Sequence, residues 1–155
     1  MDNSEEYEKM IENIAVLVHK KFRNLYREKN KGIRIKITID EAWIKKHGTN
    51  QADLAKLDYF ELPKDWQKSR WLGSKAALDA LLEKNKLGES LDEKFIEYAS
   101  NLVHEEWLDR NRSSAEDKYK IPYKKLSEDA KEKDRIFVRA AIEIYSSKKN
   151  PRAEL

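Results

Sequence analysis

The sequence contains no cysteine among its 155 residues. Disulfide bonds, cysteine-based zinc sites and thiol nucleophiles are therefore excluded, and the composition suits a reducing compartment. Glycine and proline are also scarce, with 4 and 3 residues, which leaves few turns and favours long helices. A chain of this length is expected to form a single domain, residues 1–155, around one core.

The sequence also has little net charge and no long hydrophobic run. Charged residues make up 39% of it, yet 32 basic and 29 acidic side chains leave a net charge of only +3. The overall field gives no general reason to bind nucleic acid or membrane. No basic segment precedes an apolar one near the N-terminus, and the run from Ile14 to Val18 is far shorter than the roughly 20 residues of a membrane span. We expect a cytoplasmic protein.

Apolar residues at spacings of three and four predict two long helices in the first half of the chain. The first carries a stripe from Tyr7 to Leu25 and is expected to end near residues 30–32, at an asparagine and a glycine. The second begins at Pro63, which suits a first turn, and runs to about Asn85. Gly73 is expected to weaken it locally.

Two more helices are predicted in the second half. Ser90 and Glu93 form a capping box for a helix that continues through Trp107. A polar loop, residues 111–120, separates it from a last helix that Ser127 caps. From Lys148 onward the chain is expected to fray.

A different pattern stands between the first two helices. Four isoleucines, Ile33 to Ile39, alternate with Arg34, Lys36 and Thr38, which is typical of a half-buried strand. Three arrangements remain open: an extended segment on the helices, half of a small ribbon, or an edge offered to another protomer. After it, residues 38–41 resemble a capping box for a short helix ending at 48, and residues 50–53 resemble a cap for another turn.

The sequence repeats itself in two stretches. Leu-Val-His-x-x-aromatic occurs at 17–22 and again at 102–107, an offset of 85. Residues 59–78 align with 123–142 at a constant offset of 64, matching Tyr59 to Tyr123 and Arg70 to Asp134. The first unit (about 5–85) therefore carries an insertion (about 31–51) that the second unit (about 90–147) lacks. We expect a mainly helical fold, with a four-helix core from two pseudo-symmetric helix–loop–helix units and a short β-like insertion.

The second unit resembles a known family. His104-Glu-Glu-Trp107, then Pro122-Tyr123-x-x-Leu126 and Lys131-x-x-Asp134-Arg135, is similar to the ryanodine-receptor repeat (RyR) domain over residues 92–145. The first unit, with Leu62-Pro63-x-Asp65-Trp66, resembles it more distantly, and residues 40–44 are similar to a segment of uncharacterised bacterial and phage proteins. The resemblance implies a non-enzymatic binding or sensor module for nucleotide-derived ligands. The loop 111–120 lacks the glycine- and tryptophan-containing stretch usual in the family.

No catalytic or metal-binding signature is present. His104-Glu-Glu begins like a zinc-protease motif, but position 108 is leucine where a second histidine is required. We therefore expect no enzyme, metal site or cofactor. His19 and His104 are each expected to donate a ring N–H to a backbone carbonyl near Tyr59 or Tyr123. Asp134 is expected to pair with a lysine, an arginine or the indole of Trp107.

Three functions follow from these patterns. The first is a binding module for a small, possibly nucleotide-derived ligand or a protein partner, in a groove between the units at His104, Trp107, Tyr123 and Arg135. The second is a nucleic-acid accessory protein that uses the basic stretch 20–36, chiefly Lys20, Lys21, Arg23 and Arg27. The third is a homo-oligomer that pairs through Ile33–Ile39.

Overall fold

The computed structural model describes residues 3–149, and this part of the chain is mainly helical, as predicted. Its α-helices are α1 (Asn3–Lys29), α2 (Glu41–His47), α3 (Lys64–Lys86), α4 (Glu93–Asn111) and α5 (Glu128–Lys149). Two short strands, β1 (Ile35–Ile37) and β2 (Gln51–Asp53), lie between α1 and α3. Short 3-10 turns follow at η1 (Tyr59–Glu61), η2 (Asp117–Tyr119) and η3 (Tyr123–Lys125).

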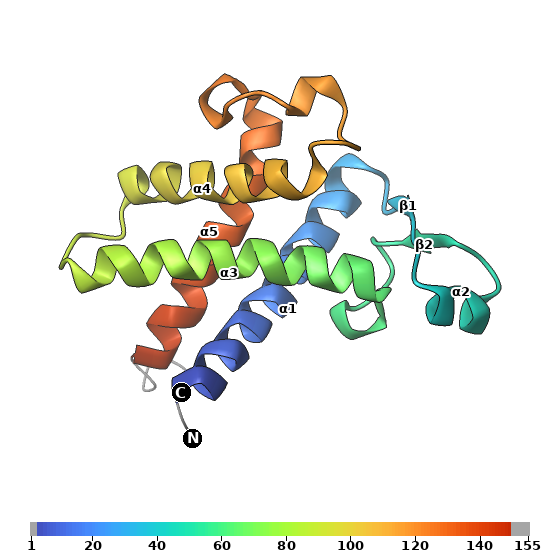
Figure 1. Ribbon diagram of the computed structural model, residues 1–155, viewed down its shortest axis with the longest axis horizontal. Coiled ribbons are helices and arrows are strands. Elements are labelled where there is room, and N and C mark those ends of the chain that lie inside the picture. The colour runs from blue at the N-terminus through green and yellow to red at the C-terminus, as the bar shows by residue number, and fades with distance from the viewer. Residues whose placement is uncertain (1–2, 150–155) are drawn as a thin grey trace.

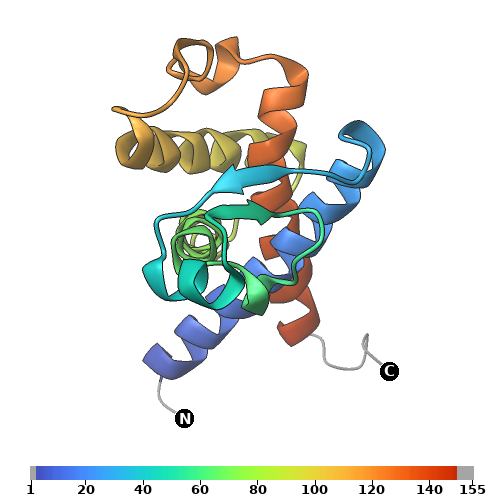
Figure 2. The same cartoon turned by 90° about the vertical axis from the view of Figure 1, so that its right-hand side faces the viewer.

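The four long helices pack against one another in two crossed pairs. α3 and α4 run side by side, and α1 and α5 cross them on the far side (Figure 1). Turned by 90°, the small ribbon is seen to lie over one end of α3 (Figure 2). The apolar stripes face inward, and their most deeply buried members come from all four helices: Ile11, Ile14, Val18, Leu78, Leu81, Val103 and Val138.

Gly73 lies where α3 packs tightly against Phe137 of α5. A Cβ atom at this position would lie 2.5 Å from the ring of Phe137, so only glycine leaves room for the phenylalanine. The helix continues through Gly73 from Lys64 to Lys86. The residue therefore serves helix packing, a role that the low helix propensity of glycine does not predict.

The isoleucine segment forms half of a small ribbon, one of the three predicted arrangements. β1 pairs with β2 in antiparallel register, with Lys36 opposite Ala52. The predicted cap at residues 50–53 is wrong, because these residues form β2 or precede it, and the Asp53 carboxylate accepts hydrogen bonds from the backbone N–H of Arg34 and of Ala55.

In the segment that contains β1, the apolar face is exposed to solvent and the polar face is turned inward. The four isoleucines are 46 to 81% exposed, whereas Thr38 is buried and Arg34 and Lys36 are half-buried. Cross-strand neighbours share a face of a ribbon, and Ala52, the partner of Lys36, is fully buried. The cations therefore point toward the helices, and the isoleucines point away.

At two helices the N-cap lies two residues after the predicted one. α2 begins after Asp40, whose carboxylate accepts from the backbone N–H of Trp43, and α4 begins after Asp92, whose carboxylate accepts from that of Phe95. An aspartate was available closer to each helix than the predicted threonine or serine. The predicted cap at Ser127 is confirmed, since its hydroxyl oxygen accepts from the backbone N–H of Ala130 at 3.2 Å.

The C-terminal tail lies mostly outside the described residues. α5 continues to Lys149, so the first two residues of the predicted frayed tail are helical, and positions 150–155 fall beyond the described range. Within residues 3–149, no helix combines the length and apolarity that crossing a membrane requires. The cytoplasmic location stays a prediction.

Candidate functional site

Two histidines tie their helices to the turns that precede α3 and α5. Nε2 of His19 on α1 donates to the carbonyl oxygen of Leu57 at 2.8 Å, and Nε2 of His104 on α4 donates to that of Ile121 at 2.7 Å. These are the predicted tethers, and the two acceptors are 64 residues apart, as the repeat requires. In the neutral ring of His19 the proton lies on Nε2, so Nδ1 can only accept.

Arg70 and Asp134, which the repeat aligns, face the two Nδ1 atoms. Nε of Arg70 donates to Nδ1 of His19 at 3.4 Å, whereas Oδ2 of Asp134 lies 3.6 Å from Nδ1 of His104. Burial and the charge of Arg70 lower the pKa of His19 to about 4, so this ring is neutral. Burial raises the pKa of Asp134 to about 8, with Lys133 opposing, so its carboxyl is largely protonated at neutral pH. The expected partners of Asp134 were wrong, because its side chain faces a histidine.

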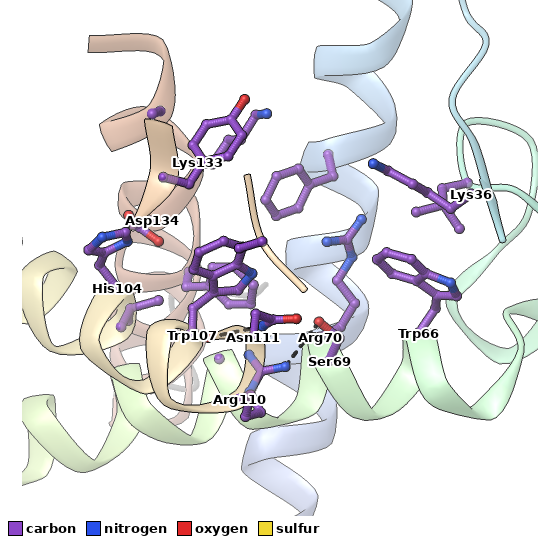
Figure 3. Close-up of a pocket in the computed structure, with 18 of the residues that line it drawn as sticks. Lys36, Trp66, Ser69, Arg70, His104, Trp107, Arg110, Asn111, Lys133 and Asp134 are labelled. Atoms are coloured by element: carbon purple, nitrogen blue, oxygen red, sulfur yellow. Dashed lines mark hydrogen bonds and ion pairs between the residues drawn. The ribbon is translucent and has the colours of Figure 1, made fainter. Parts of the chain in front are cut away.

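A cleft of about 520 Å³ opens beside these residues. Its walls come from the four long helices, β1 and the loop that follows α4, and Trp66, Trp107 and Tyr119 contribute aromatic faces. In Figure 3, Trp66 and Trp107 stand on opposite sides, with the side chain of Arg70 between them. A planar group would therefore meet aromatic surface on either side.

The cleft carries more positive than negative charge. Its basic residues are Arg34, Lys36, Arg70, Arg110 and Lys133, and its acidic residues are Asp65, Glu116 and Asp134. Of the acids, Asp134 is mostly neutral for the reason given above. The Asp65 carboxylate already accepts from the hydroxyl of Thr38 at 2.6 Å and from the backbone N–H of Ile39 at 3.2 Å.

Arg70 is a buried cation without an acidic partner among the described residues. The residue is only 7% exposed, and its guanidinium donates to His19 and, at 2.9 Å, to the hydroxyl of Tyr26. It also lies 4.2 Å from the ring centre of Phe22. Neutral acceptors and an aromatic face compensate only part of the cost of burying a charge, so an anion in the cleft would stabilise Arg70 further.

Three further cations at the cleft make no side-chain hydrogen bond or ion pair with any residue in the range 3–149: Arg34, Lys36 and Lys133. Arg34 lies 5.9 Å from the ring centre of Tyr26, and Lys133 lies 5.9 Å from that of Tyr119. Burial and the charges of Arg34, Lys133 and Arg70 lower the pKa of Lys36. Figure 3 shows Lys36 and Lys133 reaching toward the cleft from opposite sides. The charges of Arg34, Lys133 and Arg70 therefore repel that of Lys36 across the cleft.

The structure brings together two of the four predicted ligand residues. His104 and Trp107 line the cleft, but Tyr123 and Arg135 lie outside its lining. Both contact Glu97 instead. The Tyr123 hydroxyl donates to the Glu97 carboxylate at 3.0 Å, and Nε of Arg135 donates to the same carboxylate at 2.8 Å. Burial and the hydrogen bond with Glu97 raise the pKa of Tyr123 to about 12.

Most of the predicted nucleic-acid residues have intramolecular partners. Lys21 pairs with Glu143 at 3.3 Å, Arg23 pairs with Asp58 at 2.5 Å, and Arg27 donates to Asn24 at 3.2 Å. Lys20 is exposed. The last part of the basic stretch, Arg34 and Lys36, turns into the cleft, away from a continuous basic surface.

Arg34 and Lys36 were predicted only as part of a basic stretch for nucleic acid, and none of the cations that line the cleft was predicted to do so. The alternation does place Arg34 and Lys36 on the same face of the strand. Because the opposite face consists of isoleucines, however, the sequence predicts that the isoleucine face is buried and the cationic face is exposed. Arg70 was recognised only as the counterpart of Asp134. Among residues 3–149, no group of histidines and carboxylates is arranged to hold a metal ion.

Comparisons with protein-family models, with curated proteins and with solved structures found no match to this chain.

Proposed function

We propose that this chain is a non-catalytic binding or sensor module whose cleft takes a small anionic ligand with a planar part. The observation that carries the proposal is Arg70, a buried guanidinium that points into the cleft and has no acidic partner in the described range. Arg34, Lys36 and Lys133 add positive charge around it. A phosphate or carboxylate would form charge-assisted hydrogen bonds with these groups and relieve their repulsion.

The size and the walls of the cleft favour a small molecule. Ligand sites commonly enclose about 300–1,000 Å³, and the cleft volume of about 520 Å³ falls in this range. The indoles of Trp66 and Trp107 offer faces on which a base or another flat ring can stack. A nucleotide-derived ligand combines the negative charge and the ring, and it agrees with the RyR resemblance.

We also propose that the fold arose from two copies of one helix–loop–helix unit, arranged as a pseudo-symmetric four-helix core. The support is the recurrence of contacts at the predicted offsets. His19 and His104 bind carbonyls of aligned residues, and Arg70 and Asp134 face their Nδ1 atoms. A contact that recurs in each unit is expected of a structural residue, which favours a non-catalytic role for both histidines.

The test is the thermal stability of the protein with inorganic phosphate, pyrophosphate, AMP and ATP. A ligand at 100 times its dissociation constant adds about 2.7 kcal/mol, which corresponds to roughly 5–10 °C in Tm for a chain of this size. We expect Lys133→Gln, in the cleft, to reduce the shift and Lys94→Gln, an exposed lysine on α4, to keep it. If no anion raises Tm, or if both variants respond like the wild type, the proposal is wrong.

Self-association through Ile33–Ile39 is the second candidate. Four neighbouring isoleucines that are 46 to 81% exposed form an apolar patch of the kind found at interaction sites. Sedimentation over a wide concentration range tests it, and a monomer at the highest concentration would remove it.

A further inference from the structure

We infer that Lys36 is a reactive amine, which forms a Schiff base with a small aldehyde or ketone that also carries a phosphate or carboxylate. The inference rests on the proposed function in one respect: the cations of the cleft hold the anionic group of the substrate. It adds a covalent step and a class of ligand that non-covalent binding alone does not require.

The position of Lys36 is fixed by the ribbon. It lies at the centre of β1, opposite the fully buried Ala52, and on the face that turns toward the helices. Figure 3 shows its side chain reaching from the strand into the cleft, on the side where Trp66 stands. The amine is therefore presented to any molecule that occupies the cleft.

No carboxylate of the described chain forms an ion pair with this amine. Asp65, which also lines the cleft, is engaged by Thr38 and by the backbone N–H of Ile39. Glu116 is near enough to favour the charged amine, but its side chain is mostly exposed and pairs with Lys118 at 3.5 Å. The ammonium form of Lys36 thus lacks the partner that usually stabilises it.

The surrounding charges act against the ammonium form. Arg34 on the same strand segment, Lys133 on α5 and Arg70 on α3 each disfavour a further positive charge at Lys36, and burial does so more strongly. Only the neutral amine is a nucleophile, and desolvation beside other cations is a known way to activate a lysine. The same cations attract an anionic substrate, so they serve both the binding and the reactivity.

The reaction is balanced without an oxidant or a reductant. The lone pair of the neutral Lys36 amine forms a bond to the carbonyl carbon, and the π electrons of the carbonyl move to its oxygen, which takes up a proton. The resulting carbinolamine loses water, and a protonated imine remains between Lys36 and the substrate. The step is reversible by addition of water.

The experiment uses pyridoxal 5′-phosphate, an aromatic aldehyde with a phosphate, trapped with borohydride and located by peptide mass spectrometry. At substoichiometric reagent and neutral pH, we expect Lys36 to be labelled faster than the exposed Lys20, because burial and the neighbouring cations lower the pKa of Lys36. Pyrophosphate should protect Lys36 and leave Lys20 unprotected. Lys36→Arg should remove the labelled peptide, whereas Lys20→Arg should not change labelling at Lys36.

A second reagent separates reactivity from anion binding. Acetic anhydride is uncharged, so the rate at which it acetylates Lys36 across pH 7–10 reflects the reactivity of the amine and not the binding of an anion. At neutral pH, acetylation of Lys36 should again be faster than acetylation of Lys20. Equal rates at the two lysines with both reagents would overturn the inference, and the proposed function would survive if pyrophosphate still bound. Fast acetylation without pyrophosphate binding or protection would overturn both the anionic substrate and the proposed function.

Discussion

Replacing Asp134 by asparagine should stabilise the protein, increasingly so as the pH rises. Burial raises the pKa of this carboxyl from 3.8 to about 8, so the folded state holds a proton that the unfolded state has lost at neutral pH. Asparagine keeps the shape of the neutral carboxyl and cannot ionise. The variant therefore removes the cost of keeping Asp134 protonated, or of leaving it charged, in the cleft beside His104.

The sign and size follow from proton linkage. Between pH 4 and 8 the folded state binds more protons at Asp134 than the unfolded state does, so the contribution of Asp134 to stability falls as the pH rises. One pKa unit corresponds to about 1.4 kcal/mol, which makes the slope at most about −1.4 kcal/mol per pH unit and the whole effect at most about 6 kcal/mol. Below pH 4 and above pH 8, both states have the same protonation and the slope disappears.

Urea unfolding at pH 5, 6, 7, 8 and 9 measures this difference. The gap in unfolding free energy between Asp134→Asn and the wild type should widen up to about pH 8 and then remain constant. Asp129→Asn is the matched control on the same helix, because a hydrogen bond from Lys29 lowers the pKa of that exposed carboxyl. It should show no widening advantage. A gap for Asp134→Asn that does not change from pH 5 to 8 would show that the Asp134 carboxyl is not held protonated in the folded state.

Three other substitutions test the packing. Gly73→Ala should destabilise the protein by about 1–3 kcal/mol in urea unfolding, because its methyl group would overlap the ring of Phe137; an unchanged midpoint would contradict this close approach. His19→Leu should cost about 1–3 kcal/mol in the same assay, since the carbonyl of Leu57 loses its donor, and a neutral effect would argue against the tether. Ile37→Lys should change the unfolding free energy by less than about 0.5 kcal/mol because this side chain is exposed, whereas a cost above about 2 kcal/mol would show that its face is buried.

The long helices could be predicted from the sequence because each carries an apolar stripe at helical spacing. Helix starts were less predictable, since several residues near each start can cap it. At α4, Ser90 and Asp92 compete, and the carboxylate two residues later accepts the backbone N–H of Phe95. Gly73 shows a different limit, because the reason for a glycine lies on another helix, at Phe137.

The candidate site was only partly predictable, and the strand shows why. Alternation establishes that a strand has two faces, but which face turns inward depends on its partner and on the helices beneath. Here Ala52 opposite Lys36 is buried, so the cations face the cleft. His104 and Trp107 were correctly predicted to line one site, because they lie one turn apart on the same helix. Tyr123 and Arg135 belong to the same sequence motif, but their side chains contact Glu97 outside the cleft.

Isothermal titration calorimetry of two double variants with pyrophosphate tests most simply whether the unpaired cations of the cleft hold an anion. Lys36→Gln with Lys133→Gln removes two charges from the cleft, and Lys20→Gln with Lys94→Gln removes two exposed charges elsewhere, so both variants have the same net charge. We expect pyrophosphate to form a one-to-one complex with the wild type and with the second variant, and to lose binding to the first. Equal binding by both variants, or no binding by the wild type, would contradict it.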